Sequence, residues 1–131
     1  MPFRCDRPQL LRGVHVLVVE DDADQRELLR LHLETEGAHV EEASGTKEAL
    51  ATVESVALEL VLTDVHMPGG DGIWLLSHIR RLRPRMAVVA VTGLWDPEAV
   101  AQAGFDAVIQ KPFKWKQLSA TVALLLAARA A

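Results

Sequence analysis

Two kinds of hydrophobic pattern alternate along the chain. Short apolar runs rich in valine are typical of strands, and runs without alternating polar positions are typical of strands that are buried on both faces. By this criterion we expect five strands, at residues 14–19, 38–43, 58–63, 87–92 and 107–110. The second run, residues 38–43, has a weaker strand pattern than the first.

Between the runs, apolar residues recur every three or four positions, which is typical of amphipathic helices. We expect helices at residues 23–36, 46–55, 73–83, 97–103 and 115–128. Gly37, Pro84 and Gly104 are suited to ending helices, and Ser44 and Asp96 to capping their starts. Five β–α units in succession predict an α/β fold, with a parallel sheet covered by helices on both faces.

Composition and charge are those of one ordinary globular domain. The chain has 131 residues, of which 50% are apolar and 24% charged, and a formal charge of −4. We expect an N-terminal tail over 1–13, which holds the lone Cys5, and a domain over 14–131. A single cysteine suits a reducing, cytoplasmic setting. Mild acidity argues against direct nucleic-acid binding, and no apolar run reaches the roughly 20 residues of a membrane span.

Residues suited to phosphoryl chemistry lie at the ends of four expected strands. Glu20 and Asp21 follow the first strand, Asp64 follows the third, Thr92 ends the fourth and Lys111 follows the fifth. The carboxyl ends of parallel strands share one edge of a sheet, where ligands bind. Clustered carboxylates repel one another unless a cation neutralises them, and oxygen ligands suit Mg²⁺ or Mn²⁺. The pattern predicts a phosphoryl-transfer site in which a carboxylate is the acceptor.

Four segments in order make the chain similar to the receiver domains of response regulators, the family typified by the bacterial chemotaxis response regulator. They are VLVVEDD (16–22), TDVHMPGGDG (63–72), AVTG (90–93) and AGFDAVIQKPF (103–113). The resemblance implies a doubly wound, flavodoxin-like (βα)5 fold with strand order 2-1-3-4-5. It also implies a bacterial two-component signalling domain rather than an enzyme, one that assists its own phosphorylation and dephosphorylation.

The same resemblance implies how the site works. Asp64 is the phosphoacceptor, which takes a phosphoryl group from a sensor histidine kinase or a histidine phosphotransfer protein. Asp21 binds Mg²⁺ directly, Glu20 acts through a metal-bound water, and the main-chain carbonyl of His66 supplies another metal oxygen beside Asp64.

Two further residues complete the implied site and connect it to the protein surface. Thr92 is the switch hydroxyl, and Lys111 contacts the phosphoryl group, aimed inward by a cis bond to Pro112. Phosphorylation shifts the surface formed by the fourth helix, fifth strand and fifth helix, which a downstream partner reads.

Val108 departs from the family pattern, which usually has an aromatic switch residue three positions before the lysine. Phosphorylation chemistry is expected to survive, because Val108 carries none of it, but a valine has no ring to swing in response to Thr92. We expect output to pass instead through loop movement, with Trp95 as a candidate reporter. Leu94 is expected to shield the phosphoryl group and slow its hydrolysis.

Several residues have two interpretations. Asp22 either caps the first helix, which we favour, or contacts the metal. The side chain of His66 is expected at the pocket mouth rather than on the metal, and Trp74 is expected to pack on its helix face. The last helix is either an alanine-rich end or a patch for a homodimer or an output partner.

No output domain is expected within the chain, and three contexts stay open: a free-standing receiver, part of a hybrid kinase, or part of a larger regulator. A rival class is a protein-interaction module that works without phosphorylation, a pseudo-receiver. Its weakness is that such a module has no physical need for clustered carboxylates. A haloacid-dehalogenase-type phosphatase would want a second aspartate where His66 stands.

Overall fold

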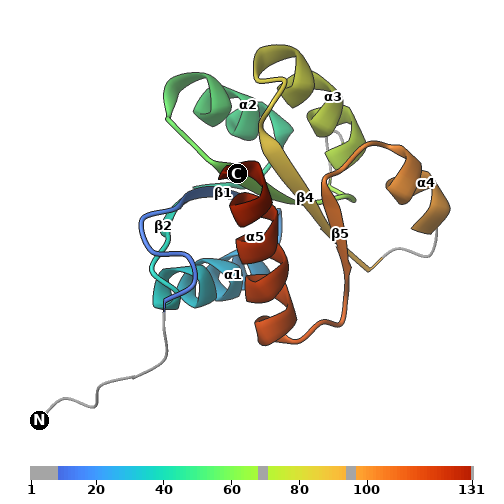
Figure 1. The fold of residues 1–131 in the computed structure, drawn as a ribbon. Helices are drawn as coiled ribbons and strands as arrows, with labels where there is room; N and C mark the ends of the chain where they lie inside the picture. The colour runs from blue at the N-terminus through green and yellow to red at the C-terminus, as the bar shows by residue number, and fades with distance from the viewer. Residues whose placement is uncertain (1–8, 68–70, 94–96, 131) are drawn as a thin grey trace, which may run out of the picture.

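Strands and helices alternate along the chain in the expected order. The computed structural model describes residues 9–67, 71–93 and 97–130 (Figure 1). The strands are β1 (His15–Val19), β2 (His39–Ala43), β3 (Leu60–Asp64), β4 (Ala87–Thr92) and β5 (Ala107–Gln110). The helices are α1 (Ala23–Thr35), α2 (Thr46–Ser55), α3 (Gly72–Leu82), α4 (Pro97–Gln102) and α5 (Trp115–Ala130).

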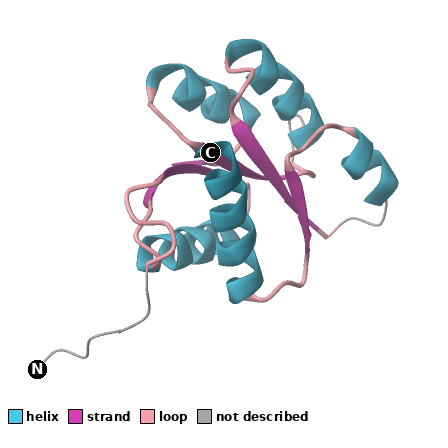
Figure 2. Ribbon diagram, viewed as in Figure 1, coloured by secondary structure: helices cyan, strands magenta, loops and turns pink. Residues whose placement is uncertain are grey.

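The five strands form one parallel sheet in the order β2-β1-β3-β4-β5, which confirms the expected topology. Successive side chains of a strand point to opposite faces. Val16 and Val18 therefore pack with α1 and α5, whereas Leu17 and Val19 pack with α2 and α3. The two helical layers on either side of the sheet are visible in Figure 2. This layering leaves the carboxyl ends of the strands at one open edge.

One detail of the helices, the cap of α2, differs from expectation. Gly45, not Ser44, is the N-cap of α2, and the Ser44 hydroxyl instead donates to Glu48 Oε2 at 3.1 Å. Trp74 lies on the outer face of α3, where it is 44% exposed and stacks on His78 of the same helix with ring centroids 3.8 Å apart. The buried face of α3 consists of Gly72, Leu75, Leu76 and Ile79.

The segment before β1 contributes to the core. Leu11, within the expected tail, is fully buried in the cluster beneath α1 and α5. Its N–H donates to the Glu36 carbonyl at 2.9 Å. Gly37 ends α1 as expected, with a positive φ of 96°, and a Cβ there would lie 2.8 Å from the Arg12 Cα. Residue 37 must therefore be small for the segment before β1 to pack against the end of α1.

The last helix buries more of its apolar surface than its composition indicates. Leu118 and Val122 are fully buried, and Leu125 and Leu126 pack partly against the same cluster. Leu124 alone among these leucines is largely exposed, at 72%. The surface available for a dimer or an output partner on this helix is correspondingly narrow.

Some expectations concern residues outside the described ranges, namely those for Cys5, Leu94, Trp95 and Asp96. Within those ranges, none of the helices combines the length and apolarity that crossing a bilayer requires.

Candidate functional site

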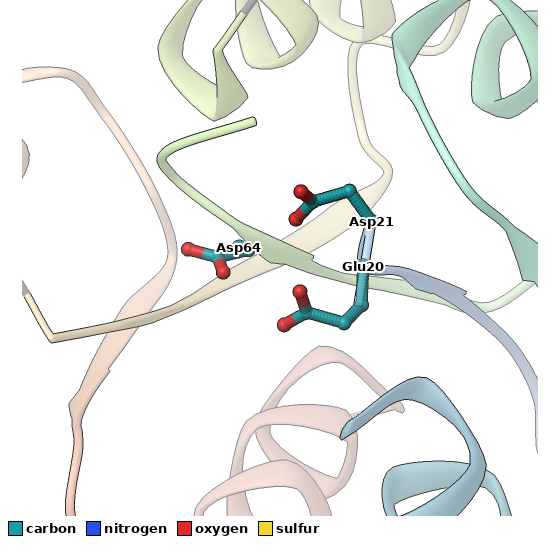
Figure 3. A group of neighbouring side chains, drawn as sticks. All are labelled: Glu20, Asp21 and Asp64. Atoms are coloured by element: carbon teal, nitrogen blue, oxygen red, sulfur yellow. The ribbon is translucent and has the colours of Figure 1, made fainter. Parts of the chain in front are cut away.

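Three carboxylates meet at the carboxyl edge of the sheet. Glu20 and Asp21 directly follow β1, and Asp64 is the last residue of β3 (Figure 3). One carboxylate oxygen from each of the three lies within 4.8 Å of the others. They come together because β1 and β3 are neighbours in register, with Val19 opposite Thr63. The structure thus assembles the expected acidic cluster from two chain segments.

Lys111 reaches the same cluster from the end of β5. Its Nζ lies 3.4 Å from Glu20 Oε1 and 3.4 Å from Asp64 Oδ2. A shorter contact, at 2.8 Å, joins Nζ to Oε1 of Gln25 on α1. The bond from Lys111 to Pro112 is cis, as expected. The ammonium is therefore shared between two acids and one neutral amide.

Glu20 is the most buried member of the cluster, with only 2% of the residue exposed. The pKa of Glu20 is raised from 4.5 to about 7, chiefly by burial and also by the nearby Asp64 carboxylate. The Asp22 N–H, which donates to Glu20 Oε2 at 3.1 Å, and the Lys111 ammonium oppose this rise in pKa. The residues present supply too little positive charge to keep this carboxylate readily ionised, so the site favours an added cation.

The first turn of α1 is tied to the acidic loop. The Asp22 side chain accepts hydrogen bonds from the N–H groups of Asp24 at 2.9 Å and Gln25 at 3.1 Å, so Asp22 is the helix cap that we favoured. One residue further, Arg26 donates to the Glu20 carbonyl at 2.7 Å. These contacts fix the start of α1 relative to Glu20.

The loop after Asp64 requires a glycine. The Gly72 N–H donates to the Val65 carbonyl at 2.7 Å, and a Cβ at residue 72 would lie 2.5 Å from the Asp64 carbonyl oxygen. Any side chain there would displace the backbone that carries Asp64. The His66 N–H donates to Asp64 Oδ1 at 3.2 Å, which orients this carboxylate, and the His66 side chain is exposed.

Thr92 ends β4 beside the cluster and is buried, at 4% exposed. Its carbonyl accepts the Lys111 N–H at 2.8 Å, so the ends of β4 and β5 are directly joined. Val108 lies on β5 opposite Ala90 and is 41% exposed. The valine side chain at this position is already partly in solvent, and it has no aromatic ring that could move.

The donor set fits Mg²⁺ on chemical grounds. All three side chains offer carboxylate oxygens, which hard divalent cations prefer, and no sulfur or imidazole ligand competes within the described cluster. The cluster also leaves room for water or phosphate oxygens, because Asp21 is exposed and Asp64 only partly buried. Mg²⁺ usually keeps such open positions.

Sequence reasoning missed two residues of the site. Gln25 contacts Lys111 across 86 positions of sequence, and Arg26 anchors the Glu20 carbonyl. Their place one helical turn after the acidic pair was a usable signal, because a helix that starts at the sheet edge turns its first residues toward that edge.

Known proteins share both this sequence pattern and this fold. A family model described as response regulator receiver domain matches residues 16–123. The chain belongs to this family. A protein described only as an uncharacterised 14.6 kDa protein of Leptolyngbya boryana is 39% identical to this receiver domain over 109 residues, covering 79% of the chain and 83% of that protein.

Longer relatives match this receiver domain over only part of their length. The transcriptional regulatory protein ResD of Bacillus subtilis is 34% identical over 85% of the chain, but the match spans 47% of ResD. The transcription factor SKN7 of Saccharomyces cerevisiae is 34% identical over 79% of the chain and 17% of its own length. The chain thus spans about half or less of these regulators.

Solved structures agree with the family assignment. A response regulator receiver domain protein from Methanospirillum hungatei superimposes with a TM-score of 0.85 and 32% identity, covering 90% of this chain and 97% of that one. The response regulator TrrA from Thermotoga maritima, in complex with Mg²⁺ and BeF, gives 0.79 and 29%, covering 86% and 98%. Receiver domains of this family bind Mg²⁺ and interact with histidine kinases and downstream effectors.

Proposed function

We propose that this receiver domain accepts a phosphoryl group on Asp64 and thereby switches a partner-binding surface. The observation that carries the proposal is the position of the Asp64 carboxylate, which lies beside two further acids and 3.4 Å from the Lys111 ammonium. A carboxylate held next to a cation-binding cluster and a fixed ammonium is suited to attack phosphorus, because the charge that develops on the phosphoryl oxygens is neutralised in place.

The metal site consists of Glu20, Asp21, Asp64 and the main-chain carbonyl of His66. When bound there, Mg²⁺ neutralises the developing charge on the transferred group. The protein residues hold the reacting groups: Asp64 presents the attacking oxygen, Lys111 contacts one phosphoryl oxygen, and the Thr92 hydroxyl donates to another after transfer.

The phosphoryl donor we propose is a phosphohistidine on a sensor histidine kinase or a histidine phosphotransfer protein. An Asp64 carboxylate oxygen forms a bond to phosphorus while the phosphorus–nitrogen bond breaks, and its electron pair returns to the imidazole nitrogen. The product is an aspartyl phosphate. This assignment is supported by the family membership and by the accessible edge at which Asp64 lies.

We propose that the signal leaves through the surface formed by α4, β5 and α5. The backbone hydrogen bond from the Lys111 N–H to the Thr92 carbonyl links the phosphoryl site to β5, where Val108 is exposed. Because Val108 has no ring to reorient, the change at this surface arises from movement of the loop after β4 rather than from an aromatic rotamer. We further propose that the protein acts in the bacterial cytoplasm, through a downstream protein or a homodimer.

The test is to bind Mg²⁺ and then beryllofluoride, a stand-in for the phosphoryl group, while following fluorescence. The chain has three tryptophans and no tyrosine, so tryptophan emission is the only aromatic signal of this kind. We expect a saturable change, together with labelling by acetyl phosphate, that Asp64→Asn abolishes. Asp24→Asn, which removes an exposed carboxylate on α1, is the matched control and should behave as wild type.

Absence of Mg²⁺ binding and of labelling in the wild-type protein would refute the phosphoacceptor role. The remaining interpretation would then be an interaction module that works without phosphorylation. The same experiment therefore separates the two functions.

A further inference from the structure

Among the described residues, the Lys111 ammonium has three oxygen neighbours, and the closest is uncharged. Nζ lies 2.8 Å from Gln25 Oε1, but 3.4 Å from both Glu20 Oε1 and Asp64 Oδ2. A lysine ammonium has three protons and no acceptor, so these three oxygens account for its full bonding capacity. Ion-pair hydrogen bonds ordinarily measure about 2.7–2.9 Å. Coulomb attraction alone would draw the ammonium closer to the carboxylates than it is.

Gln25 is held in place by the start of α1. Its N–H donates to the Asp22 cap at 3.1 Å, and the next residue, Arg26, donates to the Glu20 carbonyl at 2.7 Å. Gln25 also lines a hollow of about 260 Å³ between α1 and the loop after β5, together with Leu28 and the stem of Lys111. Helix position and side-chain packing thus present the amide oxygen to the ammonium.

We propose that Gln25 is a positioning residue for phosphoryl transfer: its amide oxygen holds the Lys111 ammonium back from Asp64. The attacking carboxylate then stays accessible, while the ammonium remains within reach of an incoming phosphoryl oxygen. This inference rests on the proposed function of Asp64.

Loss of the amide oxygen has a definite physical consequence. The ammonium would move onto the two carboxylates and pair more tightly with Asp64, because nothing else described here accepts its third proton. A tighter pair makes Asp64 a poorer nucleophile, and it must be broken before Lys111 can contact a phosphoryl oxygen. Gln25 supplies no ligand to the metal carboxylates, and a divalent cation outcompetes a single ammonium for them, so the change in Mg²⁺ affinity should be small compared with the change in the phosphoryl steps.

The decisive variant is Gln25→Met, which keeps the length and packing of the side chain and removes its oxygen. In the full chain we expect its Mg²⁺ affinity to stay within about twofold of wild type. Its affinity for beryllofluoride at saturating Mg²⁺, and its rate of labelling by acetyl phosphate, should fall about fivefold, the scale of one exposed hydrogen bond to a charged group. Gln25→Glu should reduce both further, because a carboxylate pulls Lys111 away from the phosphoryl position.

Two controls assign the effect to the contact with Lys111. Gln117→Ala removes another exposed glutamine near the start of a helix and should match wild type. In a Lys111→Met background, Gln25→Met should cause no additional loss in the residual labelling rate. A further loss in that background would show that Gln25 acts by another route and would overturn the inference.

The outcomes separate this inference from the function on which it rests. If wild-type protein binds Mg²⁺ and beryllofluoride and Gln25→Met matches it in both, Gln25 has no positioning role. If Mg²⁺ and beryllofluoride affinities fall together, Gln25 shapes the whole site rather than Lys111, and the inference is again wrong. If the wild-type protein binds neither ligand, the phosphoacceptor function itself fails.

Discussion

Carboxylates at the two ends of the strands have opposite electrostatic surroundings. At the carboxyl edge, the cluster of Glu20, Asp21 and Asp64 has one described ammonium beside it, that of Lys111, which contacts Glu20 and Asp64. At the other edge, Asp106 alone receives Arg80 at 2.8 Å, Arg129 at 2.8 Å and the Val88 N–H at 2.8 Å. The cluster at the carboxyl edge thus has more carboxylates than cationic groups, whereas the cluster around Asp106 has more cationic groups than carboxylates.

The pKa directions follow this contrast. Burial raises the pKa of Glu20 to about 7. Burial also acts to raise the pKa of Asp106, but the hydrogen bonds from Arg80 and the Val88 N–H, with the charges of Arg80 and Arg129, lower it overall. A satisfied carboxylate that joins α3, β4 and α5 stabilises the fold. A cluster that is left short of positive charge costs stability, which indicates a binding site.

The largest effect we expect is a pH dependence that belongs to Glu20. Because its folded pKa lies above 4.5, folding favours the protonated form, and this stabilisation is lost as pH rises from about 4.5 through about 7. The metal-free protein should lose up to about 3 kcal/mol of unfolding free energy over that window. Urea titrations at several pH values give the unfolding free energy of wild type and of Glu20→Gln. The difference between the two slopes of unfolding free energy against pH measures the loss that belongs to Glu20.

Asp106→Ala should produce the next largest effect, with the opposite relation to pH. It leaves Arg80, Arg129 and the Val88 N–H without their shared acceptor, and we expect a loss of about 2–3 kcal/mol at neutral pH. Since the pKa of Asp106 is lowered, the loss should shrink as pH falls below its ordinary value of 3.8. Denaturant melts measure it, with Glu54→Gln on exposed α2 surface as the control. Unchanged stability would show that the arginines do not depend on Asp106.

Much of this contrast was predictable from sequence. Strands without alternating polar positions locate the sheet, and in β4 and β5 both ends match the expected residues. Strand ends then locate Glu20, Asp21, Asp64 and Lys111, since neighbouring parallel strands bring their ends together. The acidic edge follows from local pattern and topology alone.

What was missed depends on contacts between distant segments. Leu11 is buried only because its turn packs against the end of α1, and nothing in its polar surroundings indicates this. Gly72 is required by its approach to the Asp64 carbonyl, and Gln25 meets Lys111 only once the fold brings the start of α1 to the segment after β5. Helical spacing also does not say which of two adjacent apolar stripes faces the sheet, and Trp74 lies on the exposed one.

Glu20→Gln should weaken Mg²⁺ binding about tenfold at pH 8, the scale of losing one supporting group in a metal site. The wild-type affinity should rise between pH 6 and pH 8, because Glu20 releases its proton in that range, and the variant should lose this rise. Isothermal titration in two buffers of different ionisation enthalpy also counts the proton released. Asp106→Ala should bind Mg²⁺ as wild type does, since it lies at the opposite edge; a shared loss would remove the distinction between the edges.

The smallest effect concerns Asp22, which lies between the acidic cluster and the helix that supports it. Its side chain accepts two helix N–H groups, so Asp22→Ala should cost about 1 kcal/mol of stability through loss of the cap. Asp22→Asn keeps the capping oxygen and removes the charge, so it should retain wild-type stability and, because Asp22 is not a metal ligand, wild-type Mg²⁺ affinity. A weaker Mg²⁺ affinity in Asp22→Asn, with stability intact, would make Asp22 a fourth acid of the site and increase the charge imbalance that distinguishes this edge.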